Sequence, residues 1–364
     1  MNTIRKVIGI AMSIITLTGI LSGCAQAPTT PELDQRNYDC VSNYQPRVNF
    51  GAKFEPKGNY ILHGAGQAQH GIMETFDKYV QAVGSDLTPC ITMGYASPHH
   101  NFVDWASTMQ KGIETYGDEN YLFLQVGVHF NKDENPDECY YDQIASGAMD
   151  DIVKSLIWVL KDFNRPVFCR AGFEFNGEWN GYKDPEIYKA AFIRFAELVK
   201  ECEADNIALV WCYNPDAADK EYMKYYPGDE YVDWWAIDIF RAGSMEMENT
   251  KGFLEEAAFH EKPVMLTETT PYLFDVTKGE GWEEWFEPFF RFIRDNPVIK
   301  AFCYINWEWS TYPQWANWGD ARLEEAPESL VELYRQELRD PIFFHATDKQ
   351  SSIEGLYDCR DYQK

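Results

Sequence analysis

The chain has 364 residues and a formal net charge of −26 at pH 7, with 45% hydrophobic residues. A chain this acidic repels phosphate, which argues against nucleic acid and anionic membrane surfaces as partners. The charge is compatible with neutral ligands such as sugars, and equally with a role in solubility alone. The 12 Trp, 22 Tyr and 23 Phe exceed the needs of a core, so we expect some rings to face solvent or a ligand.

Residues 1–23 have the pattern of an export signal rather than of folded structure. Arg5 precedes an apolar run, residues 7–21, and small residues separate that run from Cys24. The stretch 21–24 resembles a bacterial lipobox, which implies cleavage before Cys24 and lipidation of its thiol. An ordinary secretory signal with a chance cysteine is the alternative.

These features divide the chain into four predicted segments. Residues 1–23 form a lipoprotein signal peptide, and residues 24–48, rich in Pro, Thr, Gln and Asn, form a tether. Residues 49–345 form one folded domain, and residues 346–364 form a C-terminal extension that is packed on this domain or flexible. The signal and lipobox imply export and anchoring to the cell envelope through this lipid alone. Because alanine rather than aspartate follows Cys24, we expect sorting to the outer membrane in a Gram-negative host.

Apolar, β-branched or aromatic runs of strand length recur after residue 50. They lie at Tyr60–Ala65, Thr88–Tyr95, Tyr121–Phe130, Pro166–Phe173, Ile207–Tyr213, Asp233–Phe240, Pro263–Thr267 and Ile299–Ile305. Runs this apolar are typical of strands that are buried on both faces, and therefore of a parallel sheet.

Segments with apolar spacing near 3.6 residues lie between these strands and predict helices. They include Asp142–Asp162, Pro185–Glu203, Asn249–His260, Trp282–Arg294 and Pro327–Leu338. Asp184 before Pro185 is typical of an N-cap followed by a first-turn proline. Eight strands, each followed by a helix, close a (β/α)8 TIM barrel, so we predict this α/β fold. A doubly wound open sheet is the competing fold, but its glycine-rich phosphate loop is absent from the sequence.

Eight cysteines remain besides Cys24. Four lie in predicted strands, where we expect buried free thiols rather than bridges. These four are Cys90, Cys169, Cys212 and Cys303. Cys40 and Cys359 lie near the two chain ends, and a bridge between them stays open as an alternative.

Two glutamates stand where predicted strands end. Glu174 follows Pro166–Phe173, and Glu268 follows Pro263–Thr267. Catalytic side chains of such barrels lie at the C-terminal ends of strands, and a carboxylate there needs a cleft or a partner. The fourth and seventh strands lie on opposite sides of the barrel mouth, so the two carboxyls are placed to flank a bound sugar, as glycoside hydrolysis requires. Separate structural pairing of each glutamate with an arginine is the alternative.

The chain also resembles a known family over roughly residues 160–310. Besides the two glutamates, Asn206–Pro215 is similar to the fifth strand, and Tyr226–Phe240 to the approach to the sixth strand, of glycoside hydrolase family 26 in clan A. The known activities of that family are mostly endo-β-mannanases, with xylanases and β-glucanases. The resemblance implies a retaining endo-β-glycoside hydrolase, with Glu174 as acid/base, Glu268 as nucleophile and β-mannan as the leading substrate.

Two positions depart from the pattern of that family. Phe173 stands where the family usually places histidine before the acid/base, and Phe240 where it usually ends the sixth strand with tyrosine near the nucleophile. Both changes remove polar contacts to the catalytic carboxylates, which indicates a divergent member. The competing function is a non-catalytic, cell-surface glycan-binding lipoprotein on a barrel scaffold, and an inverting hydrolase is a third option.

Three polar residues are candidates for contact with substrate or for support of the glutamates. By strand alternation Arg170 shares the inward face of the fourth strand with Glu174, where it is placed to pair with a carboxylate. Asp238 ends the sixth strand and is placed to orient Arg170. Asn176 is a candidate for a hydrogen bond to a sugar hydroxyl. For each of them an ion pair in the core or a loop cap is an equal alternative.

Aromatic side chains after the strands are candidate sugar platforms, because the apolar faces of pyranose rings stack on indole rings while tyrosine and tryptophan keep a polar edge. The candidates are Trp179, Tyr182, Tyr213, Trp307, Trp309 and Trp318. An apolar plug at the barrel rim is the alternative for those after the eighth strand. His63 and His129 lie at or near the ends of the first and third strands and are candidates for substrate contact or structural histidines.

The sequence predicts no metal and no cofactor. The His99–His100 pair lacks a partner at metal-ligand spacing, and no nucleophile elbow occurs. Residues 133–137 alternate like a calcium loop, but a proline and the lack of the loop glycine argue against one. We expect a polysaccharide or oligosaccharide as the partner, and no nucleic acid. We also expect a monomer.

Overall fold

The computed structural model describes residues 46–68, 71–98, 101–117, 122–132 and 135–348. Several predictions concern residues outside these ranges. They include the signal peptide, most of the tether, the lipidation of Cys24, a Cys40–Cys359 bridge, His99–His100 and nearly all of the C-terminal extension. Within the described ranges, no helix combines the length and the apolarity needed to cross a membrane.

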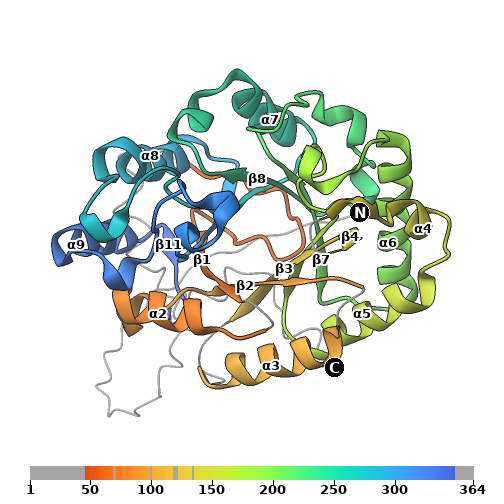
Figure 1. The fold of residues 1–364 in the computed structure, drawn as a ribbon, viewed down its shortest axis with the longest axis horizontal. Coiled ribbons are helices and arrows are strands. Elements are labelled where there is room, and N and C mark those ends of the chain that lie inside the picture. Colours follow the sequence, from red (N-terminus) through yellow and green to blue (C-terminus); the bar gives the residue numbers. More distant parts are fainter. Residues whose placement is uncertain (1–45, 69–70, 99–100, 118–121, 133–134, 349–364) are drawn as a thin grey trace, which may run out of the picture. The chain divides into compact units, whose positions relative to one another are not determined.

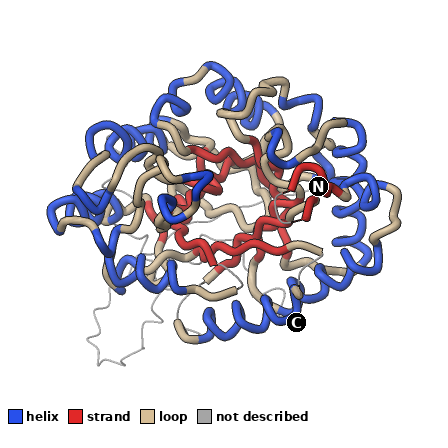
Figure 2. Tube along the Cα trace, in the orientation of Figure 1, coloured by secondary structure: helices blue, strands red, loops and turns tan. Residues whose placement is uncertain are grey.

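Eight parallel strands form a closed barrel (Figure 1). They are β1 (Ile61–Ala68), β2 (Ile91–Ala96), β3 (Phe123–Val128), β6 (Val167–Ala171), β7 (Ile207–Tyr213), β8 (Trp234–Ile239), β9 (Val264–Thr269) and β10 (Ile299–Tyr304). Each pairs with the next along the chain, and β10 returns to pair with β1, where Leu62 lies opposite Ala301. Figure 2 shows the strands as an inner ring with helices outside it. This is the predicted (β/α)8 barrel.

Helices follow the strands and cover the outside of the barrel. They are α2 (Glu74–Val83), α3 (Phe102–Glu114), α5 (Asp150–Asp162), α6 (Pro185–Glu201), α7 (Glu248–Phe259), α8 (Glu287–Asp295) and α9 (Glu328–Leu338). Each buries one apolar face; α8, for example, buries Phe289, Phe290 and Ile293 at helical spacing. A short hairpin, β4 (Asn131–Lys132) with β5 (Asn135–Cys139), follows β3 and leads to α4 (Tyr141–Ala145).

The predicted elements agree with the observed ones in order and type. The strand predicted at Ile207–Tyr213 has the observed bounds, and the Asp184 carboxylate accepts the capping hydrogen bonds at the start of α6. The single helix predicted at Asp142–Asp162 is wrong. It is divided into α4 and α5, because Gly147 takes a left-handed φ of 78° that ends a helix. The strand cysteines are buried free thiols, as predicted, namely Cys90, Cys169, Cys212 and Cys303.

Aromatic rings fill the N-terminal end of the barrel. Phe123, Phe168 and Trp234 come from the first residues of their strands, and Phe54 enters from the segment before β1. The Phe168 ring lies 6.0 Å from that of Phe54, 6.1 Å from Phe123 and 5.2 Å from Trp234, measured between ring centroids. All four side chains are buried, so these rings plug this end of the cylinder.

A buried polar cluster lies between the barrel and the helices outside it. His63 of β1 shares one hydrogen bond with His345 at 3.0 Å and another with the Tyr79 hydroxyl at 2.7 Å. The Tyr79 hydroxyl in turn meets that of Tyr334 at 2.9 Å. Burial lowers the pKa of His63 well below its usual value, and His345 lowers it further. His63 therefore belongs to the packed shell and stays neutral in the folded chain.

We expect the free energy of unfolding to decrease as the pH falls below about 6.5, because the unfolded chain then binds a proton at His63 that the folded chain does not bind. One such group contributes a slope of up to about 1.4 kcal/mol per pH unit. Denaturant unfolding between pH 7.5 and 5 measures this slope. His63→Phe keeps the ring contact with Phe302 and should show a shallower dependence. Equal slopes in the two proteins would contradict the prediction.

Candidate active site

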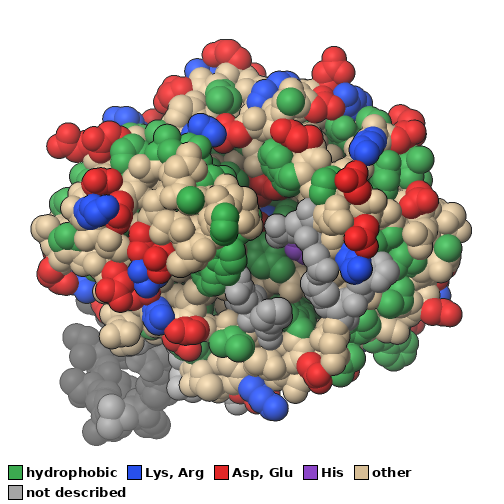
Figure 3. All heavy atoms as spheres, viewed as in Figure 1, with side chains coloured by type: hydrophobic (Ala, Val, Ile, Leu, Met, Phe, Trp, Pro, Cys, Tyr) green, Lys and Arg blue, Asp and Glu red, His purple; other side chains and the backbone are tan. Residues whose placement is uncertain are grey.

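The strand ends meet at the open end of the barrel. Figure 3 shows a hollow in the molecular surface over this part of the barrel, with hydrophobic side chains on its walls and acidic and histidine side chains within it. Glu174 follows β6, and Glu268 lies on β9. Both are largely buried, with 8% and 7% of their surfaces exposed. The two predicted glutamates thus lie at the same end of the cylinder.

The chain leaves β6 through a turn with left-handed backbone. Gly172 has a φ of 58°, and a Cβ there would come within 2.7 Å of the Phe130 ring. Glu174 has a φ of 47°, which is strained for a residue with a side chain. Asn180 holds this turn, because its Nδ2 donates to the carbonyl oxygens of Phe173 and Glu174 at 3.0 and 3.1 Å. Strained backbone that neighbouring groups hold in place is common at functional sites.

Each carboxyl oxygen of Glu174 has its own donor. Asn214, which follows β7, donates from Nδ2 to Oε1 at 2.5 Å. Trp179 donates from Nε1 to Oε2 at 2.6 Å, while 37% of its surface stays exposed. Asn214 is itself fixed, since its backbone N–H donates to Asn176 Oδ1 at 3.0 Å. The Glu174 carboxyl is therefore held in one orientation.

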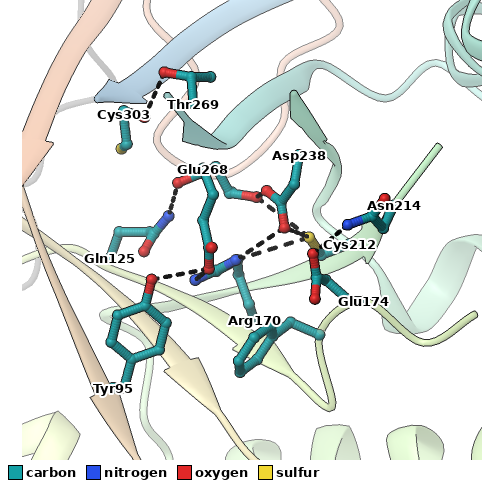
Figure 4. A network of polar contacts seen from close by, with 12 residues as sticks. Tyr95, Gln125, Arg170, Glu174, Cys212, Asn214, Asp238, Glu268, Thr269 and Cys303 are labelled. Atoms are coloured by element: carbon teal, nitrogen blue, oxygen red, sulfur yellow. Dashed lines mark hydrogen bonds and ion pairs between the residues drawn. The ribbon is translucent and has the colours of Figure 1, made fainter. Parts of the chain in front are cut away.

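Glu268 is held through a single oxygen. Its Oε1 accepts from Arg170 Nη2 at 2.6 Å and from the Tyr95 hydroxyl at 2.9 Å. The other nitrogen of the guanidinium, Nη1, lies 3.4 Å from Asp238 Oδ2. Figure 4 shows the Arg170 guanidinium between the carboxylates of Glu268 and Asp238, with Glu174 and Asn214 on the Asp238 side. Arg170 thus links two acidic side chains below the hollow.

Asp238 has further donors deep in the barrel. Thr267 donates to Oδ1 at 2.5 Å, and the Cys212 thiol donates to Oδ2 at 3.3 Å. Asp238 and Arg170 are both fully buried. Buried charges are tolerated when they are paired and hydrogen-bonded in this way. The predicted pairing of Arg170 with Asp238 is present, and the pair supports Glu268.

The two glutamates have different electrostatic surroundings. Burial raises the pKa of Glu174 well above its usual value, and the negative charges of Asp238 and Glu268 raise it further. Burial likewise raises the pKa of Asp238 to about 7, with Glu268 adding to the effect and Arg170 opposing it. Glu268 instead has the guanidinium of Arg170 in direct contact. This arrangement favours a protonated Glu174 and pairs Glu268 with a cation.

Phe173 and Phe240 are the two departures from the family pattern. Both side chains pack against neighbouring rings or the Arg170 guanidinium. The Phe173 ring lies 4.5 Å from the Arg170 guanidinium and 4.7 Å from the His129 ring. The Phe240 ring lies 5.3 Å from that of Trp318. Neither side chain donates a hydrogen bond to a glutamate. The polar support of both carboxyls comes from other residues.

The structure separates the remaining candidates into two groups. His129, Trp307 and Trp318 lie in the loops at the open end, where Trp307 stacks on Tyr312 at 6.1 Å and Trp318 lies 4.9 Å from Trp309. Trp309 is buried and donates from Nε1 to Thr270 at 3.2 Å. Trp307 and Trp318 form a partly exposed aromatic rim, and the buried Trp309 packs against it.

The other candidates are bonded within the protein. Tyr182 accepts from the backbone N–H of Phe130 at 3.0 Å, and Tyr213 accepts from Asn249 at 2.8 Å. Asn176 donates from Nδ2 to the carbonyl oxygens of Asn214 and Asp219. These three and His63 are buried. Their described hydrogen bonds hold loops or the shell together rather than reaching toward Glu174 or Glu268.

Sequence reasoning missed three residues of the site, Tyr95, Asn214 and Asn180. Tyr95 lies on β2, within a predicted strand, and the Asn214-Pro215 pair directly follows the β7 strand. A polar residue at a strand end was the available signal for Tyr95 and Asn214. Asn180 supports the backbone of the turn before it, and no sequence pattern marks it. In the described residues, no group of three or more histidine, cysteine, aspartate or glutamate side chains is arranged to hold a metal ion.

Comparisons with known proteins found a matching family profile and several similar proteins. The sequence profile described as Glycosyl hydrolase family 26 matches residues 129–279. The β-1,3-xylanase TXYA of a Vibrio species is 31% identical over 255 residues, 62% of this chain and 53% of that protein. A β-1,3-xylanase of an Alcaligenes species is 29% identical over 268 residues, 65% of this chain and 55% of that protein. This chain therefore spans about half the length of these relatives.

The same fold is found among solved structures. An endo-β-1,4-mannanase double mutant of Cellulomonas fimi superposes with a TM-score of 0.59 at 15% sequence identity. The superposition covers 81% of this chain and 74% of the mannanase. At this level of identity the likeness establishes the (β/α)8 barrel and nothing finer.

Proposed function

We propose that the chain is a retaining endo-β-glycoside hydrolase of glycosyl hydrolase family 26, with Glu174 as the acid/base and Glu268 as the nucleophile. One observation carries the proposal. Glu174 lies in surroundings that favour its protonated form, while Glu268 is paired with Arg170. A carboxyl group with a raised pKa suits the acid, and a carboxyl group held by a guanidinium suits the nucleophile. The match of residues 129–279 to the family profile supports the same conclusion.

In the first step, Glu268 Oε2 attacks the anomeric carbon while the Glu174 proton moves to the departing glycosidic oxygen. The bond between the anomeric carbon and that oxygen breaks, and a glycosyl ester forms on Glu268. In the second step, Glu174 takes a proton from water as the water oxygen attacks the anomeric carbon. The ester bond breaks, which restores the Glu268 carboxylate and a protonated Glu174. Two inversions give a product with the starting anomeric configuration.

We propose β-1,3-xylan as the first substrate to test, since two relatives named β-1,3-xylanase match 62% and 65% of this chain. β-Mannan is the second, because the resemblance of Tyr226–Phe240 is to a family made up mostly of endo-β-mannanases. The aromatic rim of Trp307 and Trp318 suits either neutral polymer, since its partly exposed rings offer apolar faces to pyranoses. We also propose export and anchoring through Cys24, which rests on the sequence of residues 21–24.

A panel of β-1,3-xylan, β-1,4-xylan, β-mannan and mixed-linkage β-glucan tests the proposal by release of reducing ends. Proton NMR of the first anomer formed then separates retention from inversion. We expect release from β-1,3-xylan or β-mannan, and a β-anomer as the first product. An α-anomer would establish the inverting mechanism instead. Binding without any release would favour the non-catalytic glycan-binding protein.

A further inference from the structure

Tyr95 contacts Glu268. It was not among the site residues predicted from the sequence. We propose that Tyr95 is a positioning residue which, together with Arg170, holds one oxygen of Glu268 so that the other oxygen faces the sugar. This role rests on the proposed function, in which Glu268 is the nucleophile. The hydroxyl of Tyr95 acts through Glu268 and forms no bond to the reacting atoms.

The hydrogen bonds on Glu268 are unevenly divided between its two oxygens. Arg170 and Tyr95 both donate to Oε1, at 2.6 and 2.9 Å. No side chain or backbone group of the described residues donates to Oε2. When Oε2 forms its bond to the anomeric carbon, Oε1 becomes the carbonyl oxygen of the ester and stays within reach of both donors. The two donors therefore need not move between the free and the glycosylated states, as preorganised donors should not.

The register of the barrel places Tyr95 and Arg170 in one row. Tyr95 of β2 lies opposite Gly127 of β3, and Gly127 lies opposite Arg170 of β6. A Cβ on Gly127 would come within 2.9 Å of Tyr95 Cδ1 and 3.1 Å of Arg170 Nη2. Only glycine leaves room for both side chains to lean over the intervening strand. Tyr95 and Arg170 thus lie on either side of Gly127 and donate to the same oxygen, Oε1 of Glu268.

The Tyr95 hydroxyl keeps its proton in this position. Burial raises the pKa of Tyr95 well above its usual value, and the charge of Glu268 raises it further, while Arg170 opposes the effect. A protonated phenol is a hydrogen-bond donor, and Tyr95 donates to the Glu268 carboxyl. Tyr95 is therefore a constant donor rather than a group that titrates with pH.

Phe240 has no hydroxyl that could donate to Glu268, so the donor has to come from another residue. The family resemblance predicts a tyrosine at the end of the sixth strand, near the nucleophile, and this chain has Phe240 there. The Phe240 ring packs on Trp318, and its carbonyl accepts from Trp285. A donor from β2, on another side of the barrel, supplies the contact to Glu268 instead. The hydroxyl is thus present but comes from a different strand.

Tyr95→Phe tests the proposal in the full chain. On β-1,3-xylan, or on β-mannan if the wild type cleaves it faster, we expect kcat to fall by about 10- to 100-fold. KM should change by less than about threefold, because the lost contact is to Glu268 rather than to the substrate. Tyr79→Phe is the matched control, since it removes another buried tyrosine hydroxyl, in the shell, and should leave kcat unchanged. A raised KM with unchanged kcat would overturn the proposal.

A second measurement does not depend on turnover. In chain labelled with 13C at tyrosine Cζ, the Tyr95 signal is identified by its loss in Tyr95→Phe, and we expect it to move in Glu268→Gln. Gly127→Ala should move the same signal and lower kcat, because its Cβ displaces the row. A Tyr95 signal that is unmoved by Glu268→Gln overturns the proposal. A wild type that binds but cleaves no polysaccharide overturns the proposed function alone, while the NMR result still decides whether Tyr95 holds Glu268.

Discussion

Replacing Glu268 with alanine should lower kcat by at least about 10⁴-fold while polysaccharide binding survives, because the change removes the group that forms the glycosyl ester. Release of reducing ends from β-1,3-xylan and β-mannan measures the loss. Affinity electrophoresis in gels that contain the same polymers measures binding. The Arg170 guanidinium then keeps only Asp238 as its acidic partner, so the variant should also unfold at lower denaturant concentration.

Glu248→Ala is the control for this experiment. The Glu248 side chain lies on the outer helix α7 and is 93% exposed, so its loss should leave both kcat and binding unchanged. A Glu268→Ala protein that retains wild-type turnover would falsify the assignment of the nucleophile. A wild type that binds the polymers yet shows no more turnover than Glu268→Ala would favour the non-catalytic alternative.

Arg170→Met should lose most of its activity and much of its stability together. The side chain is fully buried, and its loss leaves the carboxylates of Glu268 and Asp238 without their cation. Removing one partner of a buried charge network costs about 3–5 kcal/mol of the free energy of unfolding. Denaturant unfolding measures this cost. It should shrink as the pH falls, because protonation of Asp238, whose pKa is raised to about 7, removes an unpaired charge.

Arg194→Met is the matched control for Arg170→Met. Arg194 also pairs with acidic side chains, among them Asp150 and Glu197, but a quarter of its surface is exposed. Ion pairs at the surface contribute at most about 1 kcal/mol, so this variant should unfold nearly as the wild type does and keep its activity. If Arg170→Met cost no more than Arg194→Met, the buried network would not support the fold.

The barrel was predictable from the sequence because its strands are buried on both faces and therefore stand out as apolar runs. Glu174 and Glu268 were predictable because a carboxylate at the end of a buried strand is costly unless it faces a cleft or has a partner. Strand alternation also placed Arg170 on the inward face, and the structure shows its ion pairs with Glu268 and Asp238. Each of these predictions depends on local pattern alone.

The contacts that complete the site depend on the register between strands, so they could not be predicted from the sequence. Tyr95 reaches Glu268 only because the row from β2 to β6 has glycine at Gly127, and no local pattern encodes that alignment. Asn176 and Tyr182 lie in loops. From the sequence alone, a polar loop residue that binds sugar cannot be distinguished from one that bonds to a neighbouring loop. Their described hydrogen bonds go to neighbouring loops. The break at Gly147 was missed because helical apolar spacing continues on both sides of it.

The plug formed by Phe54, Phe168 and Trp234 closes one end of the cylinder. Substrate and water must therefore both reach the proposed site from the open end of the barrel. The departing half of a cleaved polymer has to leave before water reaches the glycosyl ester on Glu268. Until it leaves, the hydroxyl groups of another sugar chain compete with water for that ester, so this architecture favours transglycosylation whenever acceptor sugars are abundant.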